Sequence, residues 1–210
     1  NLSLIWDCEE NPNLDHVEQA DESDLAFLLK ICKDNGMSLK IMAEQIVIFD
    51  DEKYEAQEPI ITVYKPGVKA ELDNKTMPLR WLLSYNMRAK TRDTYGSCHV
   101  KYQKGKKKEV IEGAFTIPGK EKGRVLFVRE QVEDTAEAER LARKKLREAN
   151  KEEVTGSFAT IGNTNFAAGT TLLLQNFGKF DGKYLVTKVS HSITTSYITS
   201  VDIRRCLDGY

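Results

Sequence analysis

The stretch from Asn176 to Arg204 constrains the fold more than any other part of the chain. Its β-branched and aromatic residues come in two runs, 183–191 and 197–204, separated by a polar bend. Such runs predict two strands and a chain reversal. The preceding dipeptide Asp181-Gly182 favours a tight hairpin turn, which makes 171–177 a third antiparallel strand. We therefore predict a meander that forms part of a small barrel or closed sheet.

A helix is predicted over residues 23–35. Ser23 or Asp21 can cap its N-terminus, and Gly36 lies where a left-handed residue commonly ends a helix. Apolar residues at spacings of three and four form one face, which needs a surface to pack against. This face consists of Leu25, Leu28, Leu29 and Cys32, widened by Phe27 and Ile31. The hairpin predicted over 37–49 is the expected partner surface.

A second helix is predicted over 134–150. Asp134 and Glu137 form a capping box, and the apolar residues make a narrow stripe rich in alanine. Acidic residues dominate the first turns and basic residues the last, as the helix dipole favours. Because small side chains let a helix lie close against a sheet, we interpret this helix as a connector docked on the barrel.

The segments between and after the helices predict mainly strands. Alternation of apolar and polar residues indicates a half-buried strand over 98–103, and returning strands follow over 109–117 and 124–129. The segment 79–90 has a mixed pattern. We favour a strand there because the strands beyond it need a neighbour. Further strands are predicted at the chain start, at 60–64 and at 154–160.

These elements predict an α+β fold that is mainly β. We expect a small α/β unit over 1–58, built from helix 23–35 and hairpin 37–49. An antiparallel β-barrel-like domain with a docked connector helix then covers 59–210. The 210 residues can bury a sizeable core. Because the chain starts at Asn1 within an apolar run, we expect a piece of a longer protein that lacks an upstream barrel.

The composition excludes several classes of function. Lys and Arg number 31 and Asp and Glu 32, so no global field draws the protein to nucleic acid or to an anionic membrane. No apolar run reaches membrane-spanning length and no signal peptide heads the sequence, so we expect a soluble protein. The cysteines lack zinc-site spacing and are expected to be free thiols. They are Cys8, Cys32, Cys98 and Cys206.

No pattern in the sequence indicates catalysis. The three histidines, His16, His99 and His191, show no ligand spacing. Cys98 and His99 are adjacent on a predicted strand, where neighbouring side chains point to opposite faces, so they form no nucleophile and base pair. No P-loop, GxSxG or GxGxxG motif occurs, and Asp50-Asp51-Glu52 lacks the order of a calcium loop. We expect no catalytic residue, no cofactor and no metal site.

One local positive patch surrounds a predicted hairpin tip. A solvated turn or a contact with a partner protein explains it, and phosphate binding is a further reading. The residues of this possible partner contact are Lys104, Lys106, Lys107 and Lys108, close to Lys101.

Two segments resemble a known family. The first, 19–50, has the order of features seen in phage and secretion-system hub proteins: Gln, Glu-Ser-Asp, a Phe-Leu helix, Gly, and a hairpin ending in Asp. These are Gln19, Glu22-Ser23-Asp24, Phe27-Leu28, Gly36 and Asp50.

The second segment looks like the C-terminal barrel of the phage late control gene D family, which is similar to the hub of contractile tails and to type VI secretion spike proteins. An Ala-rich helix, glycine-containing loops, an Asp-Gly turn, His and Tyr-x-Thr carry the likeness. Asn176 replaces the commoner Gly, and Thr195-Ser196 stands where Gly often precedes the Tyr. The matching residues are Ala136 to Asn150, Gly162, Ala168-Gly169, Phe177-Gly178, Asp181-Gly182, Tyr184, His191 and Tyr197-Ile198-Thr199.

This resemblance implies a structural hub in the baseplate of a phage tail or of a phage-like contractile injection particle. Family hubs assemble as trimers, each subunit supplying two related barrels, and join the tail tube to the spike. The implied partners are other copies of the chain, the tail tube protein and the spike protein, with no membrane or nucleic-acid partner. The implied location is the virion or a tail-like particle, after synthesis in the bacterial cytoplasm. Two alternatives stay open: the hub-like part of a tail-associated lysin whose enzyme domain lies elsewhere, and a nucleic-acid-binding β-barrel.

Overall fold

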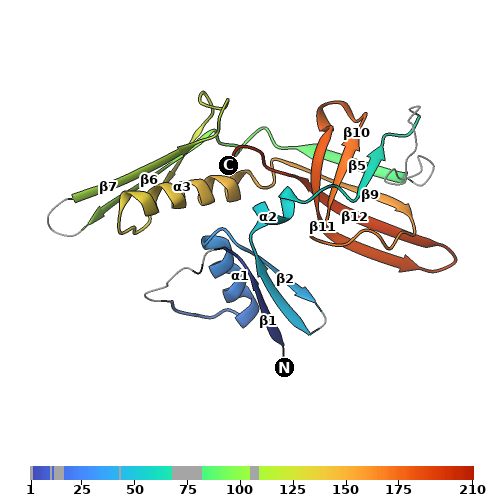
Figure 1. The fold of residues 1–210 in the computed structure, drawn as a ribbon, viewed down its shortest axis with the longest axis horizontal. Helices are drawn as coiled ribbons and strands as arrows, with labels where there is room; N and C mark the ends of the chain where they lie inside the picture. Colours follow the sequence, from blue (N-terminus) through green and yellow to red (C-terminus); the bar gives the residue numbers. More distant parts are fainter. Residues whose placement is uncertain (1, 10, 12–16, 43, 68–81, 105–108) are drawn as a thin grey trace. The chain divides into compact units, whose positions relative to one another are not determined.

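The computed structural model describes all residues except 1, 10, 12–16, 43, 68–81 and 105–108 (Figure 1). The chain forms two compact units. Unit 1 comprises 1–51, 94–150 and 209–210, and unit 2 comprises 52–93 and 151–208. The segments of these units interleave along the sequence, whereas the predicted domains 1–58 and 59–210 are consecutive. That boundary stays a prediction about which parts fold independently.

The N-terminal part of unit 1 is a three-stranded sheet with one helix. The sheet has the order β1-β3-β2, with β1 and β3 parallel and β2 and β3 antiparallel. The helix packs on it around the buried residues Cys32, Met37 and Ile48. The elements are β1 (Ser3–Asp7), α1 (Asp24–Asp34), β2 (Ser38–Met42) and β3 (Gln45–Phe49).

The predicted ends of α1 are confirmed. Ser23, not Asp21, is the cap, since its Oγ accepts from Ala26 N at 3.3 Å. Gly36 has φ +69°, the left-handed conformation expected at the end of the helix. The predicted apolar face is partly wrong, because Leu25 and Leu29 are exposed and the helix turns its Cys32 side to the sheet.

The second part of unit 1 is another three-stranded sheet, covered by the long helix. The order is β7-β6-β8, with an antiparallel β6–β7 pair and a parallel β6–β8 pair. Its core joins sheet residues such as Val100 and Ile111 to Ala138, Ala142 and Leu146 of the helix. The elements are β6 (Ser97–Lys104), β7 (Glu109–Thr116), β8 (Val125–Val128) and α3 (Thr135–Asn150).

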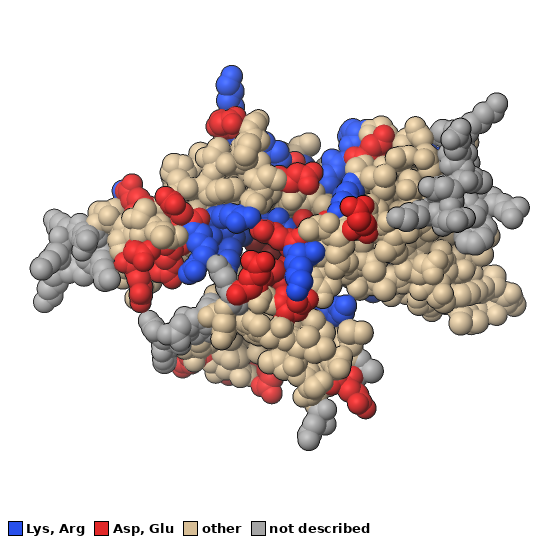
Figure 2. Space-filling view, in the orientation of Figure 1, with Lys and Arg blue, Asp and Glu red and all other residues tan. Residues whose placement is uncertain are grey.

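Helix α3 begins as predicted and docks on the β7-β6-β8 sheet. Glu137 N donates to Asp134 Oδ1 at 2.8 Å, which confirms the half of the capping box in which Asp134 caps the helix. In the return bond Glu137 Oε2 accepts from Glu133 N at 2.7 Å, one residue before the cap, and not from Asp134 N as a strict capping box requires. Acidic residues gather near the start of the helix and Lys and Arg near its end (Figure 2). A Cβ on Gly113 of β7 would lie 2.5 Å from the Ala138 carbonyl carbon. This close contact with the β7-β6-β8 sheet explains the small residues on the helix.

The buried amide of Asn150 fastens three segments of unit 1. Its Oδ1 accepts from Tyr95 N at 2.9 Å, and its Nδ2 donates to Tyr95 O at 2.8 Å and to Tyr210 Oη at 2.7 Å. Arg143 also donates to the Tyr210 carbonyl at 2.6 Å. The end of α3 therefore holds the segment before β6 and the C-terminal residue together.

Unit 2 is a six-stranded sheet that curls into a half barrel (Figure 1), in the order β4-β10-β11-β12-β9-β5. Every neighbouring pair is antiparallel except β4 and β10, which are parallel. Its core contains Val63, Leu172, Tyr184, Val201 and Ile203. The elements are α2 (Asp51–Ala56, begun at the last residue of unit 1), β4 (Ile61–Tyr64), β5 (Leu82–Ala89), β9 (Val154–Ile161), β10 (Thr171–Gln175), the 3-10 helix η2 (Gly178–Phe180), β11 (Gly182–Ile193) and β12 (Tyr197–Arg205).

The terminal meander is confirmed, with one error in its connection. Strands β10, β11 and β12 are consecutive antiparallel neighbours, but no tight turn at Asp181-Gly182 joins the first two. The link runs through η2, and Gly182 already belongs to β11. Asp181 instead stabilises the loop, because its Oδ1 accepts from Phe177 N at 2.5 Å.

Segment 79–90 is a strand over Leu82–Ala89, as favoured, while 79–81 lie outside the described residues. The expected neighbour of this strand was wrong, because it pairs with β9 and not with the strands near Val100 and Phe115.

Candidate interaction site

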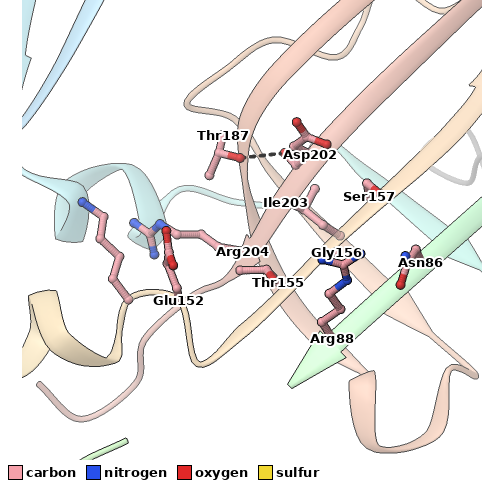
Figure 3. Close-up of a pocket in the computed structure, with 11 residues that line it drawn as sticks. Asn86, Arg88, Glu152, Thr155, Gly156, Ser157, Thr187, Asp202, Ile203 and Arg204 are labelled. Atoms are coloured by element: carbon pink, nitrogen blue, oxygen red, sulfur yellow. Dashed lines mark hydrogen bonds between the residues drawn. The ribbon is translucent and has the colours of Figure 1, made fainter. Parts of the chain in front are cut away.

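The face of the six-stranded sheet opposite its core carries a polar pocket of about 450 Å³ (Figure 3). The strand register produces the polar lining of this pocket, because residues paired across neighbouring strands share a face of the sheet. One position away, Ile203 and Met87 pack in the core, although Gly156 and Ile203 also border the pocket. Two polar rows cross β5, β9 and β12 in that order: Arg88, Thr155 and Arg204, and beside them Asn86, Ser157 and Asp202.

A β-bulge shapes the side of the pocket formed by β11. The β11–β12 register shifts between Val186 and Lys188, which leaves Thr187 as the extra residue. Its Oγ1 donates to the Asp202 carbonyl at 3.1 Å (Figure 3). Bulges re-aim side chains and are common beside functional sites. Here the bulge adds a hydroxyl-bearing residue to the polar rows.

Arg204 and Glu55 of α2 form a buried ion pair at one end of the pocket. Arg204 Nη1 donates to Glu55 Oε1 at 2.5 Å, and both side chains are 5% exposed. Glu55 Oε2 accepts from Leu207 N at 2.8 Å. Burial, and then the Glu55 charge, raise the pKa of the neighbouring Cys206 thiol to about 12. The pair ties α2 to the end of β12 and neutralises the charge of Arg204.

The other charged groups of the pocket fall into two kinds. Lys151 and Glu152 already interact within the protein, Glu152 with Lys90, whose Nζ lies 2.7 Å from the Glu152 Oε2. Arg88 and Asp202 are exposed, and in the described part of the chain neither side chain makes an ion pair. A ligand in this pocket would therefore meet one available cation and one available anion.

The predicted lysine contact remains a prediction. Lys106, Lys107 and Lys108 lie outside the described residues, and Lys104 is the last residue of β6. The structure therefore gives no geometry for this patch.

The structure describes His99, His191 and all four cysteines, which are free thiols. His99 is exposed, with its ring centroid 5.8 Å from that of Phe127, whereas Cys98 is fully buried. Burial raises the pKa of the Cys98 thiol to about 11. His191 Nδ1 lies 3.0 Å from Tyr197 Oη and 3.2 Å from Thr199 Oγ1. His16 lies outside the described residues.

The described residues contain no metal-binding group and no membrane-spanning helix. Within the described ranges no three His, Cys, Asp or Glu side chains are grouped to hold a metal ion. None of the helices described is long and apolar enough to cross a membrane.

Sequence reasoning missed the polar pocket. Its local signal is alternation, since Asn86 and Arg88, Thr155 and Ser157, and Asp202 and Arg204 are each two positions apart on a strand. That spacing predicts a polar face for each strand. The order of the strands, which aligns the three pairs, was not available from the sequence.

Several solved structures share the fold of this chain, and two of them are tail proteins. The chain resembles the tail protein from Neisseria meningitidis MC58, with TM-score 0.67 and 14% identity over 99% of this chain and 62% of that one. It also resembles the 43 kDa tail protein of prophage MuSo2 from Shewanella oneidensis, with TM-score 0.65 and 12% identity over 97% of this chain and 61% of that one. The c3393 protein of E. coli, described as a component of the type VI secretion system, gives TM-score 0.55 and 14% identity over 99% and 44%. No curated protein sequence matches significantly.

At these identities the likeness establishes the fold, so the chain has the β-rich fold of phage tail and related secretion proteins. The chain belongs to the phage tail baseplate hub (GPD) family, which it matches over residues 5–197. The chain spans about three-fifths of the first two solved structures.

Proposed function

We propose that this chain is part of a trimeric baseplate hub that joins the tail tube to the spike and does no chemistry of its own. The observation that carries the proposal is the family match over residues 5–197. Each full-length subunit would supply two related barrels, one of them upstream of this chain. The greater length of the first two solved relatives leaves room for such a barrel.

The edges of the sheets support an assembly role. Edge strands present unpaired backbone groups that can add to a sheet of a neighbouring subunit. Among the described strands β5 is an edge of the six-stranded sheet, and its Leu83 and Tyr85 are 52% and 42% exposed. Phe127, on edge strand β8 of the β7-β6-β8 sheet, is 75% exposed. Large apolar side chains on sheet edges suit contacts between subunits better than a free surface.

Two measurements on the full-length protein test the proposal. Light scattering of the free protein should give three times the subunit mass, or electron microscopy of the baseplate should show three copies of the subunit. Electron microscopy of particles with this subunit labelled should place the label where tube and spike meet. A monomer that is absent from particles would reject the hub role, and a label elsewhere in the tail would reject the junction.

A further inference from the structure

We propose that the polar pocket of unit 2 binds an extended peptide that carries an acidic residue and, three or four positions away, a basic residue. Its assignment to another tail component rests on the proposed function, but the chemistry of recognition does not. Neither the family match nor the descriptions of the solved structures named above assign a ligand to this pocket.

Arg88 supplies the position for the acidic residue. A guanidinium has a planar set of donors that matches a carboxylate in a bidentate manner. Arg88 is exposed at the pocket and makes no ion pair among the described residues. The second arginine, Arg204, is held by Glu55, so the carboxylate of a ligand is directed to Arg88.

Asp202 supplies the position for the basic residue. Its side chain is exposed, and Thr187 donates to its backbone carbonyl and not to its carboxylate. The carboxylate is therefore left to interact with a ligand. The cross-strand partner of Asp202 is Lys188, which does not line the pocket and forms no ion pair with it in the described structure. This carboxylate disfavours a purely anionic ligand such as nucleic acid, because the phosphates would be repelled.

Neutral polar groups lie between the two charges. Asn86, Ser157 and Thr155 belong to β5 and β9, and their side chains can both donate and accept hydrogen bonds. A peptide backbone also offers one donor and one acceptor per residue. The middle of the pocket therefore suits an extended main chain better than a compact ion.

The sheet sets the spacing of the two charges. Arg88 and Asp202 are two strands apart across the sheet and one two-residue step apart along it. With strands about 4.8 Å apart and a rise of about 3.3 Å per residue, their Cα atoms are about 12 Å apart. An extended peptide covers that distance in about three to four residues.

Synthetic peptides in a Gly-Ser background, each with one Glu and one Lys separated by one to six positions, provide the probe. Nuclear magnetic resonance titration of the whole chain would report affinity and place. We expect the tightest binding at separations of three and four, about fivefold tighter than at one or six. Shifted amides should include those of residues 86–88, 155–157 and 202. Equal affinity at every separation, or shifts elsewhere, would overturn the proposal.

Charge reversal separates recognition from folding. Arg88→Glu should weaken the best peptide at least about tenfold, and adding Asp202→Arg should restore binding to within about threefold. The control Lys65→Ala removes an exposed cation of unit 2 that does not line the pocket, and should change nothing. Failure of the double variant to regain binding, although folded by circular dichroism, contradicts the charge arrangement. Peptide binding by a protein absent from particles would leave this inference standing and reject only the hub proposal.

Discussion

Arg204 and Glu55 are 149 positions apart in the sequence, yet Arg204 Nη1 donates to Glu55 Oε1 at 2.5 Å in a buried ion pair. The contact joins a short helix that precedes the half barrel to the last strand of its sheet. Because each charge is desolvated, the loss of one partner leaves the other buried and uncompensated.

Glu55→Ala should therefore lower the free energy of unfolding by about 3 to 5 kcal/mol. Urea denaturation followed by circular dichroism measures the change. The matched control is Glu152→Ala, which breaks the exposed Lys90–Glu152 pair and should cost at most about 1 kcal/mol. Equal losses in the two variants would show that the buried pair contributes no more than a surface pair.

Gly113→Ala should destabilise the protein by about 1 to 3 kcal/mol, the usual cost of overpacking. The added Cβ would lie 2.5 Å from backbone atoms of Ala138 and Glu139, so α3 would have to move off β7. The control Ala114→Val changes the next residue, which is exposed on the other face of the sheet. Thermal denaturation compares them, and an unchanged Tm for Gly113→Ala would contradict the close packing.

Asn150→Ala should cost about 2 to 4 kcal/mol, because it leaves Tyr95 N, Tyr95 O and Tyr210 Oη without their partner. Tyr210→Phe is the graded comparison, since it removes only one of the three hydrogen bonds and should cost about 1 kcal/mol. Urea unfolding of both variants tests the order. A larger loss for Tyr210→Phe would show that the Tyr210 hydroxyl, and not the Asn150 amide, holds these segments.

The thiol of Cys98 should resist alkylation in the folded protein. Burial raises its pKa to about 11, so it stays protonated where an unfolded thiol, with a pKa near 9, is largely ionised. The protonated folded form contributes stability below pH 9, and this contribution is lost as the pH rises from about 9 to about 11. Unfolding free energies at pH 8 and pH 10.5 should fall less for Cys98→Ala than for the unchanged protein. Rapid reaction of folded Cys98 with iodoacetamide at pH 8 would contradict its burial.

Local patterns predicted those elements whose signals lie within a few residues. The helix caps Asp134 and Ser23 depend on contacts across one helical turn, and both are present. By contrast, no helix was predicted at Asp50-Asp51-Glu52, yet α2 begins at Asp51 and is too short to show a helical period. The exposure of Leu25 and Leu29 also escaped prediction, because an apolar stripe does not show which of its members the sheet covers.

The sequence by itself determined the mainly β composition of the fold, both longer helices with their caps, the terminal meander and the family resemblance. These depend on periodicity and on short motifs. Only the tertiary structure decided which sheet α3 covers, the parallel pairs β1–β3, β4–β10 and β6–β8, and the alignment of Arg88, Thr155 and Arg204 in one row. Hydrogen bonds between distant strands fix these features, and a backbone donor or acceptor is the same at every residue except proline, so no local pattern records its partner.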